Sequence, residues 1–265
     1  MTSDLKKCNF DFMEVGTIHT TIQDSIATVV FYHPASNSFP SSLLEKLTAE
    51  FKDLSEHNKV KVILLKSKGE KTFCAGASFD ELLTIDNKET GIQFFMGFAN
   101  LINAMRTCTK LIIGCVQGKA VGGGVGLVSA CDYVVATESA SIKLSEFFIG
   151  IGAFVIEPAV TRKIGKAAFC QLSLEATEWH SAQWAQEKKL YAKVFETQEI
   201  MLEEGKKMAQ QLAGYNPDAL TEMKKVFWEG TENWDVLLKQ RAQVSGDLVL
   251  SDFTKDALLK FKEKK

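Results

Sequence analysis

Several features that define other classes of protein are missing from this sequence. No apolar run reaches the roughly 18 residues of a membrane-spanning helix, and the N-terminal residues show no apolar signal-peptide core or cleavage site. The 31 lysines and arginines nearly balance the 33 aspartates and glutamates, so no basic surface for nucleic acid is expected. We therefore expect a cytoplasmic protein that binds neither membranes nor nucleic acid.

The cysteines and histidines form no pattern of a metal or redox site. The six cysteines include no Cys-x-x-Cys pair and stand mostly in apolar stretches, which is typical of buried free thiols in a reducing compartment. None of the four histidines has a metal-ligating residue four positions further on. Surface or structural roles are the default for these histidines, and no metal is expected.

Apolar periodicity predicts an α/β core followed by a helical tail. Residues 15–32 alternate apolar and polar side chains, as two antiparallel strands do, and residues 41–57 have helical spacing. Strand, turn and helix then alternate as far as residue 149, as in βα units that share a core. Predicted tail helices cover residues 198–213, 217–228, 231–250 and 252–262. We divide the chain into a core with the ligand site, residues 1–200, and a C-terminal helical region, residues 201–265.

A glycine-rich segment, Gly118 to Gly126, joins a predicted buried strand (Leu111 to Val116) to a predicted buried helix (Val125 to Ala130). Glycines at such a junction let backbone N–H groups approach a ligand closely. The start of a helix adds partial positive charge at the same place. The segment therefore predicts a site for an anion or an oxyanion.

Four interpretations of this segment compete. A dinucleotide fingerprint starting at Gly122 needs a third glycine where Leu127 stands, and a P-loop needs Ser or Thr where Ala120 follows Lys119. An oxyanion hole for a thioester enolate needs one N–H here and a second from elsewhere. A tightly packed strand–helix turn with no ligand is the fourth interpretation.

A second small-residue turn favours the oxyanion hole. The predicted strand Val60 to Lys66 leads into Phe73 to Leu82, so two turns from neighbouring strand–helix units can present converging N–H groups. The segments Phe73 to Ser78 (F-x-A-G-A-S) and Gly118 to Gly124 (G-x-x-x-G-G-G) resemble the two fingerprints of the crotonase superfamily, the enoyl-CoA hydratase/isomerase family. Further similarity lies in Ala130 to Ala136, in Ile142 to Gly150 with Ser145 in place of a proline, and in His33-Pro34 with Asn37.

This resemblance implies a fold, a substrate and an assembly. The fold is an α/β crotonase spiral of ββα units whose C-terminal helical region makes trimer contacts, so a homotrimer or homohexamer is expected. The substrate is an acyl-CoA of the kind handled in fatty acid metabolism, and CoA enters as part of the thioester with no separate cofactor. A tail folded back on its own domain also occurs in this family and remains the alternative.

The resemblance also assigns catalytic roles. The backbone N–H groups of Ala77 and Gly123 form the oxyanion hole, and Glu146 is the acid/base. Its neighbours Phe147, Phe148 and Ile149 favour a desolvated carboxylate with a raised pKa. A solvated glutamate in the first turn of a helix is the alternative.

One position departs from the family pattern and shapes the predicted reaction. Hydratases of this family carry a second glutamate just after the triple glycine, where this chain has Gly126. Moving a double bond needs one carboxylate, so we expect an enoyl-CoA isomerase. The alternatives are a hydratase whose second acid is Glu157 and a catalytically impaired acyl-CoA-binding or scaffold protein. The favoured interpretation of Glu157 itself is a helix N-terminal carboxylate.

Residues for CoA binding follow from the resemblance alone. They are Asn37, Ala75, Ala77, Phe79, Gly122, Gly123, Phe261 and Lys264. Lys264 is expected to reach the CoA of a neighbouring subunit, although a lysine-rich end is also typical of a solvated tail. The run Gln93 to Phe98 lies on the family's acyl-pocket helix, although aromatics at helical spacing are also typical of a core.

Overall fold

The structure, a computed structural model, describes the backbone of residues 16–263 and the side chains as far as residue 260. The strands are β1 Thr17–Gln23, β2 Ile26–Tyr32, β3 Val62–Ser67, β4 Thr72–Cys74, β5 Leu111–Val116, β6 Lys119–Val121, β7 Tyr133–Thr137, β8 Ile142–Lys143 and β9 Lys193–Phe195. The helices are α1 Ser41–Glu56, α2 Phe79–Leu82, α3 Lys88–Thr107, α4 Gly123–Ser129, the 3₁₀ turn η1 Glu146–Ile149, α5 Glu157–Leu174, α6 Ala182–Glu187, α7 Gln198–Ala213, α8 Pro217–Phe227, α9 Trp234–Leu248 and α10 Asp252–Glu263.

A six-stranded sheet, in the order β1-β2-β3-β5-β7-β9, forms the centre of the molecule. β1 and β2 make the predicted antiparallel hairpin, and every later strand joins in parallel. Asp24 and Ser25 both have positive φ, which matches the right-handed twist of the hairpin strands. The last strand, β9, pairs in parallel with β7 and completes the edge of the sheet.

A second sheet of three short parallel strands, β4-β6-β8, lies beside the first. Each of its strands follows a longer strand of the large sheet in the chain, so β3 leads to β4, β5 to β6 and β7 to β8. This repeated strand–strand unit brings the ends of β4, β6 and β8 together. In β8 only Ile142 and Lys143 pair with β6.

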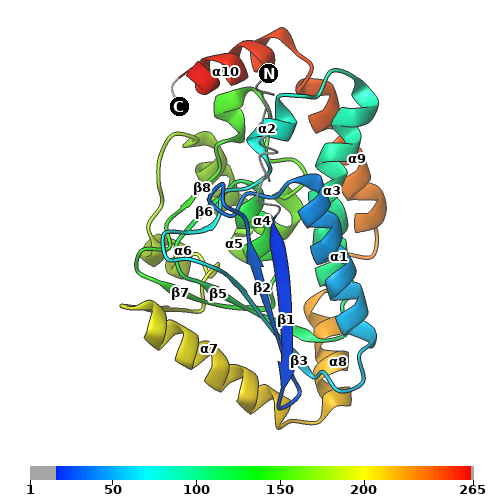
Figure 1. The fold of residues 1–265 in the computed structure, drawn as a ribbon, viewed down its shortest axis with the longest axis vertical. Helices are drawn as coiled ribbons and strands as arrows, with labels where there is room; N and C mark the ends of the chain where they lie inside the picture. The colour runs from blue at the N-terminus through cyan, green and yellow to red at the C-terminus, as the bar shows by residue number, and fades with distance from the viewer. Residues whose placement is uncertain (1–15, 264–265) are drawn as a thin grey trace, which may run out of the picture.

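Helices cover both sides of the large sheet (Figure 1). α7 packs across β2, β3, β5, β7 and β9, where Met201 and Ala209 meet an apolar patch of the sheet. α1, α3 and α9 stand side by side on the other side of the molecule, with α3 between the other two. The tail helices therefore pack on the core of their own chain, and the division at residue 200 stays a prediction.

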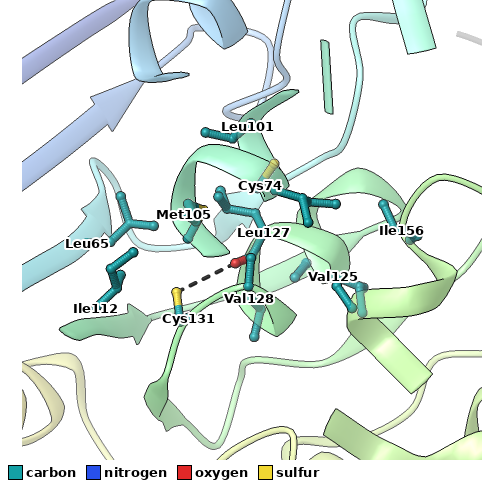
Figure 2. Packing of buried hydrophobic residues seen from close by; sticks show 14 of the residues in the cluster. Leu65, Cys74, Leu101, Met105, Ile112, Val125, Leu127, Val128, Cys131 and Ile156 are labelled. Carbon is teal, nitrogen blue, oxygen red and sulfur yellow. Dashed lines mark hydrogen bonds between the residues drawn. The ribbon is translucent and has the colours of Figure 1, made fainter. Parts of the chain in front are cut away.

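Helix α4 runs through the main apolar core. Figure 2 shows Val125, Leu127 and Val128 of α4 surrounded by side chains of the strands and of α3. Val125 and Leu127 are fully buried. This packing fixes the start of α4, which carries the glycine-rich turn, against the rest of the fold. In the described part of the chain, no helix is long and apolar enough to cross a membrane.

Candidate active site

The two glycine-containing turns pack directly against each other, backbone to backbone. β4 pairs with β6, so the turn that follows Cys74 lies next to the turn that follows Val121. Gly76 has φ +88°, and a Cβ there would lie 2.9 Å from the Val121 carbonyl oxygen and 3.4 Å from the Gly123 nitrogen. Only glycine permits both this conformation and this approach.

Each turn leaves one backbone N–H free. Among the described residues, neither the Ala77 N–H nor the Gly123 N–H donates a hydrogen bond. Their neighbours are fixed, since the Gly122 N–H donates to the Lys143 carbonyl (2.9 Å) and the Ser78 N–H to the Phe39 carbonyl (2.9 Å). Both residues line the same cavity. Two preorganised donors at one cavity wall are what an oxyanion requires.

Glu146 faces this glycine-rich turn from the start of η1. A Cβ on Gly122, whose φ is +52°, would lie 2.8 Å from the Glu146 Oε1 atom. The other carboxylate atom, Oε2, is buried and has no hydrogen-bond partner among the described residues. Burial raises the pKa of Glu146 from 4.5 to about 7, opposed by a hydrogen bond from its own backbone N–H. The solvated-glutamate alternative does not describe this carboxyl group.

This raised pKa predicts the pH dependence of the site. A base must be ionised, so kcat/KM for proton abstraction should rise as the pH increases to about 7 and level off above it. The stability of the protein has the opposite pH dependence, because the pKa of Glu146 is higher in the folded state than in the unfolded state. The contribution of Glu146 to the free energy of unfolding is therefore fully present below pH 4.5 and is lost as the pH rises through about 7. A rate profile that is flat between pH 5 and 8 would contradict the assignment of Glu146 as the base.

The cavity that contains these groups has a volume of about 490 Å³. His33, Ser36, Ser38 and Asp80 line its polar part. Burial lowers the pKa of His33, opposed by the nearby charges of Asp80 and Glu81. The rest of the wall is mostly apolar, with three phenylalanines of α3 and the segment from Phe148 to Ile156. The arrangement suits an elongated ligand with one polar and one apolar part.

The position of the second family glutamate is filled by an apolar side chain. A Cβ on Gly126 would lie 2.8 Å from Ile156 Cβ and still closer to its Cγ2 atom. Ile156 is buried and lines the cavity. A glutamate at position 126 therefore has no room unless Ile156 moves, and no carboxylate at that point can hold a water molecule.

Glu157, the candidate second acid, is not part of the cavity wall. It is the first residue of α5, and its carboxylate forms ion pairs with Lys166 (2.8 Å) and Arg241 (3.5 Å). Its Oε1 atom also accepts a hydrogen bond from the Thr161 hydroxyl (3.0 Å). This geometry matches the alternative of a helix N-terminal carboxylate, and a catalytic role of Glu157 stays a prediction.

The side chain of Asn37 makes its hydrogen bonds inside the protein, and its predicted contact with CoA stays a prediction. Its Oδ1 atom accepts from the His33 N–H (3.0 Å), and its Nδ2 atom donates to the carbonyls of Lys68 (2.9 Å) and Thr72 (2.8 Å). Asn37 does not line the cavity, whereas its neighbours Ser36 and Ser38 do. Its role is to hold the loop that presents them.

The other residues predicted for CoA binding divide into two groups. Ala75, Ala77, Phe79, Gly122 and Gly123 all line the cavity. The side chain of Phe261 and the whole of Lys264 lie outside the part of the chain that the structure describes.

Sequence reasoning missed several cavity residues, among them Asp80, Ile156 and Ser245. Ile156 and Ser245 come from segments distant in sequence from both fingerprints, so no local motif marks them. Asp80 comes two residues after the first fingerprint, and this proximity is the sequence feature that could have placed it in the site. The Phe98 ring lies where a Cβ on Gly123 would be, at 2.6 Å from its Cε1 atom, so Gly123 is required for packing as well as for ligand access.

Comparison with known proteins agrees with this geometry. A sequence model of the enoyl-CoA hydratase/isomerase family matches residues 21–265. The chain belongs to this family. It is 26% identical to the short-chain-enoyl-CoA hydratase of Clostridium acetobutylicum over 256 residues, which cover 96% of this chain and 97% of that protein.

Solved structures confirm the crotonase fold. The enoyl-CoA hydratase from Bacillus halodurans superimposes with a TM-score of 0.85 at 20% identity, covering 92% of this chain and 99% of that one. An enoyl-CoA hydratase from Mycobacterium avium gives 0.83 at 24% identity, covering 94% and 96%. The match of the family model to residues 21–265 confirms the expectation of an acyl-CoA enzyme of the enoyl-CoA hydratase/isomerase family.

Proposed function

We propose that this family member is an enoyl-CoA isomerase that uses Glu146 as its only proton carrier. The observation that supports the proposal is one buried carboxyl group, with a pKa of about 7, that shares a cavity with two free backbone N–H groups. Asp80 is the other carboxylate of the cavity wall, and it is exposed on the polar side near His33. Ile156 fills the space of a second acid next to Gly126.

The reaction then moves one proton within the acyl group. Glu146 removes a proton from C2 of a 3-enoyl-CoA, and the electrons form an enolate whose oxygen accepts hydrogen bonds from the Ala77 and Gly123 N–H groups. The enolate collapses as the double bond shifts to C2–C3, and the proton held on Glu146 passes to C4. No water enters this sequence, so an apolar wall beside Gly126 favours it.

A paired substrate assay tests the proposal. Wild-type protein should convert a 3-enoyl-CoA to the 2-enoyl isomer and should hydrate a 2-enoyl-CoA slowly, because no second carboxylate orients the water. Glu157→Gln is the matched control and should leave both rates unchanged, since Glu157 lies outside the cavity wall. Liquid chromatography with absorbance detection of the enoyl thioesters measures both reactions.

Other outcomes favour the alternatives. The relatives compared above are named hydratases, so hydration is the second candidate. Fast hydration that Glu157→Gln abolishes would overturn the isomerase proposal and make Glu157 the second acid. No turnover of either substrate, with acyl-CoA still bound tightly, would favour a binding or scaffold protein.

We also propose a homotrimer or homohexamer. Large apolar side chains remain exposed on the tail helices, among them Phe227 of α8, Val236 of α9, and Phe253 and Leu259 of α10. Burying these side chains in a subunit interface removes apolar surface from water. Light scattering at micromolar protein should give a mass three or six times 29.4 kDa, and a lone 29.4 kDa species would contradict the assembly.

A further inference from the structure

A buried serine with no hydrogen-bond partner lies in the wall of the cavity. Ser245 of α9 is 1% exposed and lines the cavity. Within the described residues, no hydrogen bond involves its hydroxyl, and the Oγ atom is not among the fully buried atoms, so it is open to the cavity. A hydroxyl that is open to a cavity and has no partner in the protein can pair with a polar group of a bound ligand. The hydroxyl at this wall therefore points to a ligand group that completes it.

Helix α3 shows where this serine lies relative to the reacting atoms. The Phe98 ring meets Gly123 at the oxyanion turn, whereas Gly91 packs against Gly246, the residue after Ser245. A Cβ on Gly91 would lie 3.0 Å from the Gly246 carbonyl oxygen. Gly91 and Phe98 are seven residues apart in one helix, which corresponds to about 10 Å along its axis. Ser245 is thus well beyond the thioester, in the part of the cavity that takes the acyl chain.

The hydroxyl of Ser245 is a polar group in a mostly apolar part of the cavity wall. Phe94, Phe95 and Ile151 are among the apolar residues of this wall. Among the residues of α9, Ser245 is the one that lines the cavity. Its hydroxyl can donate a hydrogen bond to an oxygen atom of a ligand held there.

We propose that the acyl group of the substrate carries a hydroxyl or carbonyl oxygen at its far end, and that Ser245 binds this oxygen. The proposal rests on the proposed function only in that the cavity holds an acyl-CoA. Ser245 then determines specificity: a medium-length chain that ends in a methyl group leaves the hydroxyl unpaired, and one that ends in an oxygen function satisfies it. A spacer role, in which serine is merely small enough for α9 to approach α3, makes no such distinction.

Binding of unreactive thioesters tests this without any turnover. Octanoyl-CoA and 8-hydroxyoctanoyl-CoA are saturated, so isothermal titration calorimetry measures their affinities whether or not the protein is an isomerase. Wild-type protein should bind the hydroxylated thioester about 3- to 10-fold more tightly, as expected of one additional hydrogen bond. Ser245→Ala should reduce this ratio to about one, because alanine keeps the small size and removes only the hydroxyl.

Ser173→Ala is the matched control. Ser173 is a buried serine of α5 whose hydroxyl also lacks a partner among the described residues, and it does not line the cavity. This variant should keep the wild-type preference. Equal affinity of wild-type protein for the two thioesters, or an unchanged ratio in Ser245→Ala, would overturn the proposal and leave Ser245 as a spacer. Failure of the 3-enoyl-CoA assay alone would reject the isomerase and leave the binding preference standing.

Discussion

Glu146→Gln should lower the isomerisation rate of a 3-enoyl-CoA by about 100- to 10,000-fold, the range expected when a general acid/base is removed. Glutamine has the same shape, so the side chain still fits beside Gly122, but it cannot take up a proton. Binding of a saturated acyl-CoA should stay within a few-fold of wild type, because the thioester oxygen is held by the Ala77 and Gly123 N–H groups. Stopped assays with a large excess of enzyme measure the residual rate.

The same variant should lose activity but gain thermal stability. Ionising a carboxyl group whose pKa is raised to about 7 costs free energy in the folded state, and glutamine never ionises. Glu146→Gln should therefore melt at a higher temperature than wild type at pH 8, with the difference vanishing near pH 4. A variant that loses stability at pH 8 and keeps its activity would show that Glu146 has a structural role only.

Replacing the Gly123 amide with a backbone ester should lower kcat by about 100- to 1,000-fold, as the loss of one oxyanion donor does in other enzymes. The ester removes the free N–H and adds no Cβ, so it avoids the contact with Phe98 that any larger residue makes. KM should change little, because the donor acts most strongly on the charge that develops in the transition state. Incorporation of glycolic acid at position 123 gives the required protein.

An ester at Gly69 is the control for this experiment. Gly69 is exposed, a Cβ on it would have no atom within 4 Å beyond its chain neighbours, and it lies outside the cavity wall. Its ester should leave kcat and KM at wild-type values. Near-normal turnover in the folded Gly123 ester would mean that the glycine-rich turn serves packing and not catalysis.

Local sequence patterns were sufficient for the elements that carry their own signal. The hairpin at Asp24-Ser25, the long helix α1 and the tail helices follow from apolar periodicity and turn residues, because these features depend on neighbours in the chain. Helix α5 begins at Glu157-Pro158, where the fixed φ of proline suits a first turn. The two fingerprints placed Ala77, Gly123 and Glu146 in one site, and all three line the same cavity.

Contacts between distant segments determined what the patterns left open. Glu157 and Asn37 match positions of functional residues in the family, yet neither lines the cavity. Glu157 forms ion pairs with Lys166 and Arg241. The side chain of Asn37 makes three hydrogen bonds to backbone groups. Ile156 beside Gly126, Phe98 against Gly123 and Ser245 at the far end of the acyl region are cavity residues for which no local motif exists.

The sequence by itself predicted the order of the main strands and helices, the family and the two turns whose free N–H groups line the cavity, because glycine conformation and apolar spacing act over a few residues. Only the tertiary structure decided which carboxyl group is desolvated and that no acidic side chain fits beside Gly126. Burial of Glu146 Oε2 and the filling of the Gly126 site by Ile156 both arise from segments that meet only after folding. A pKa depends on everything within a few ångströms of the group, whatever its distance along the chain.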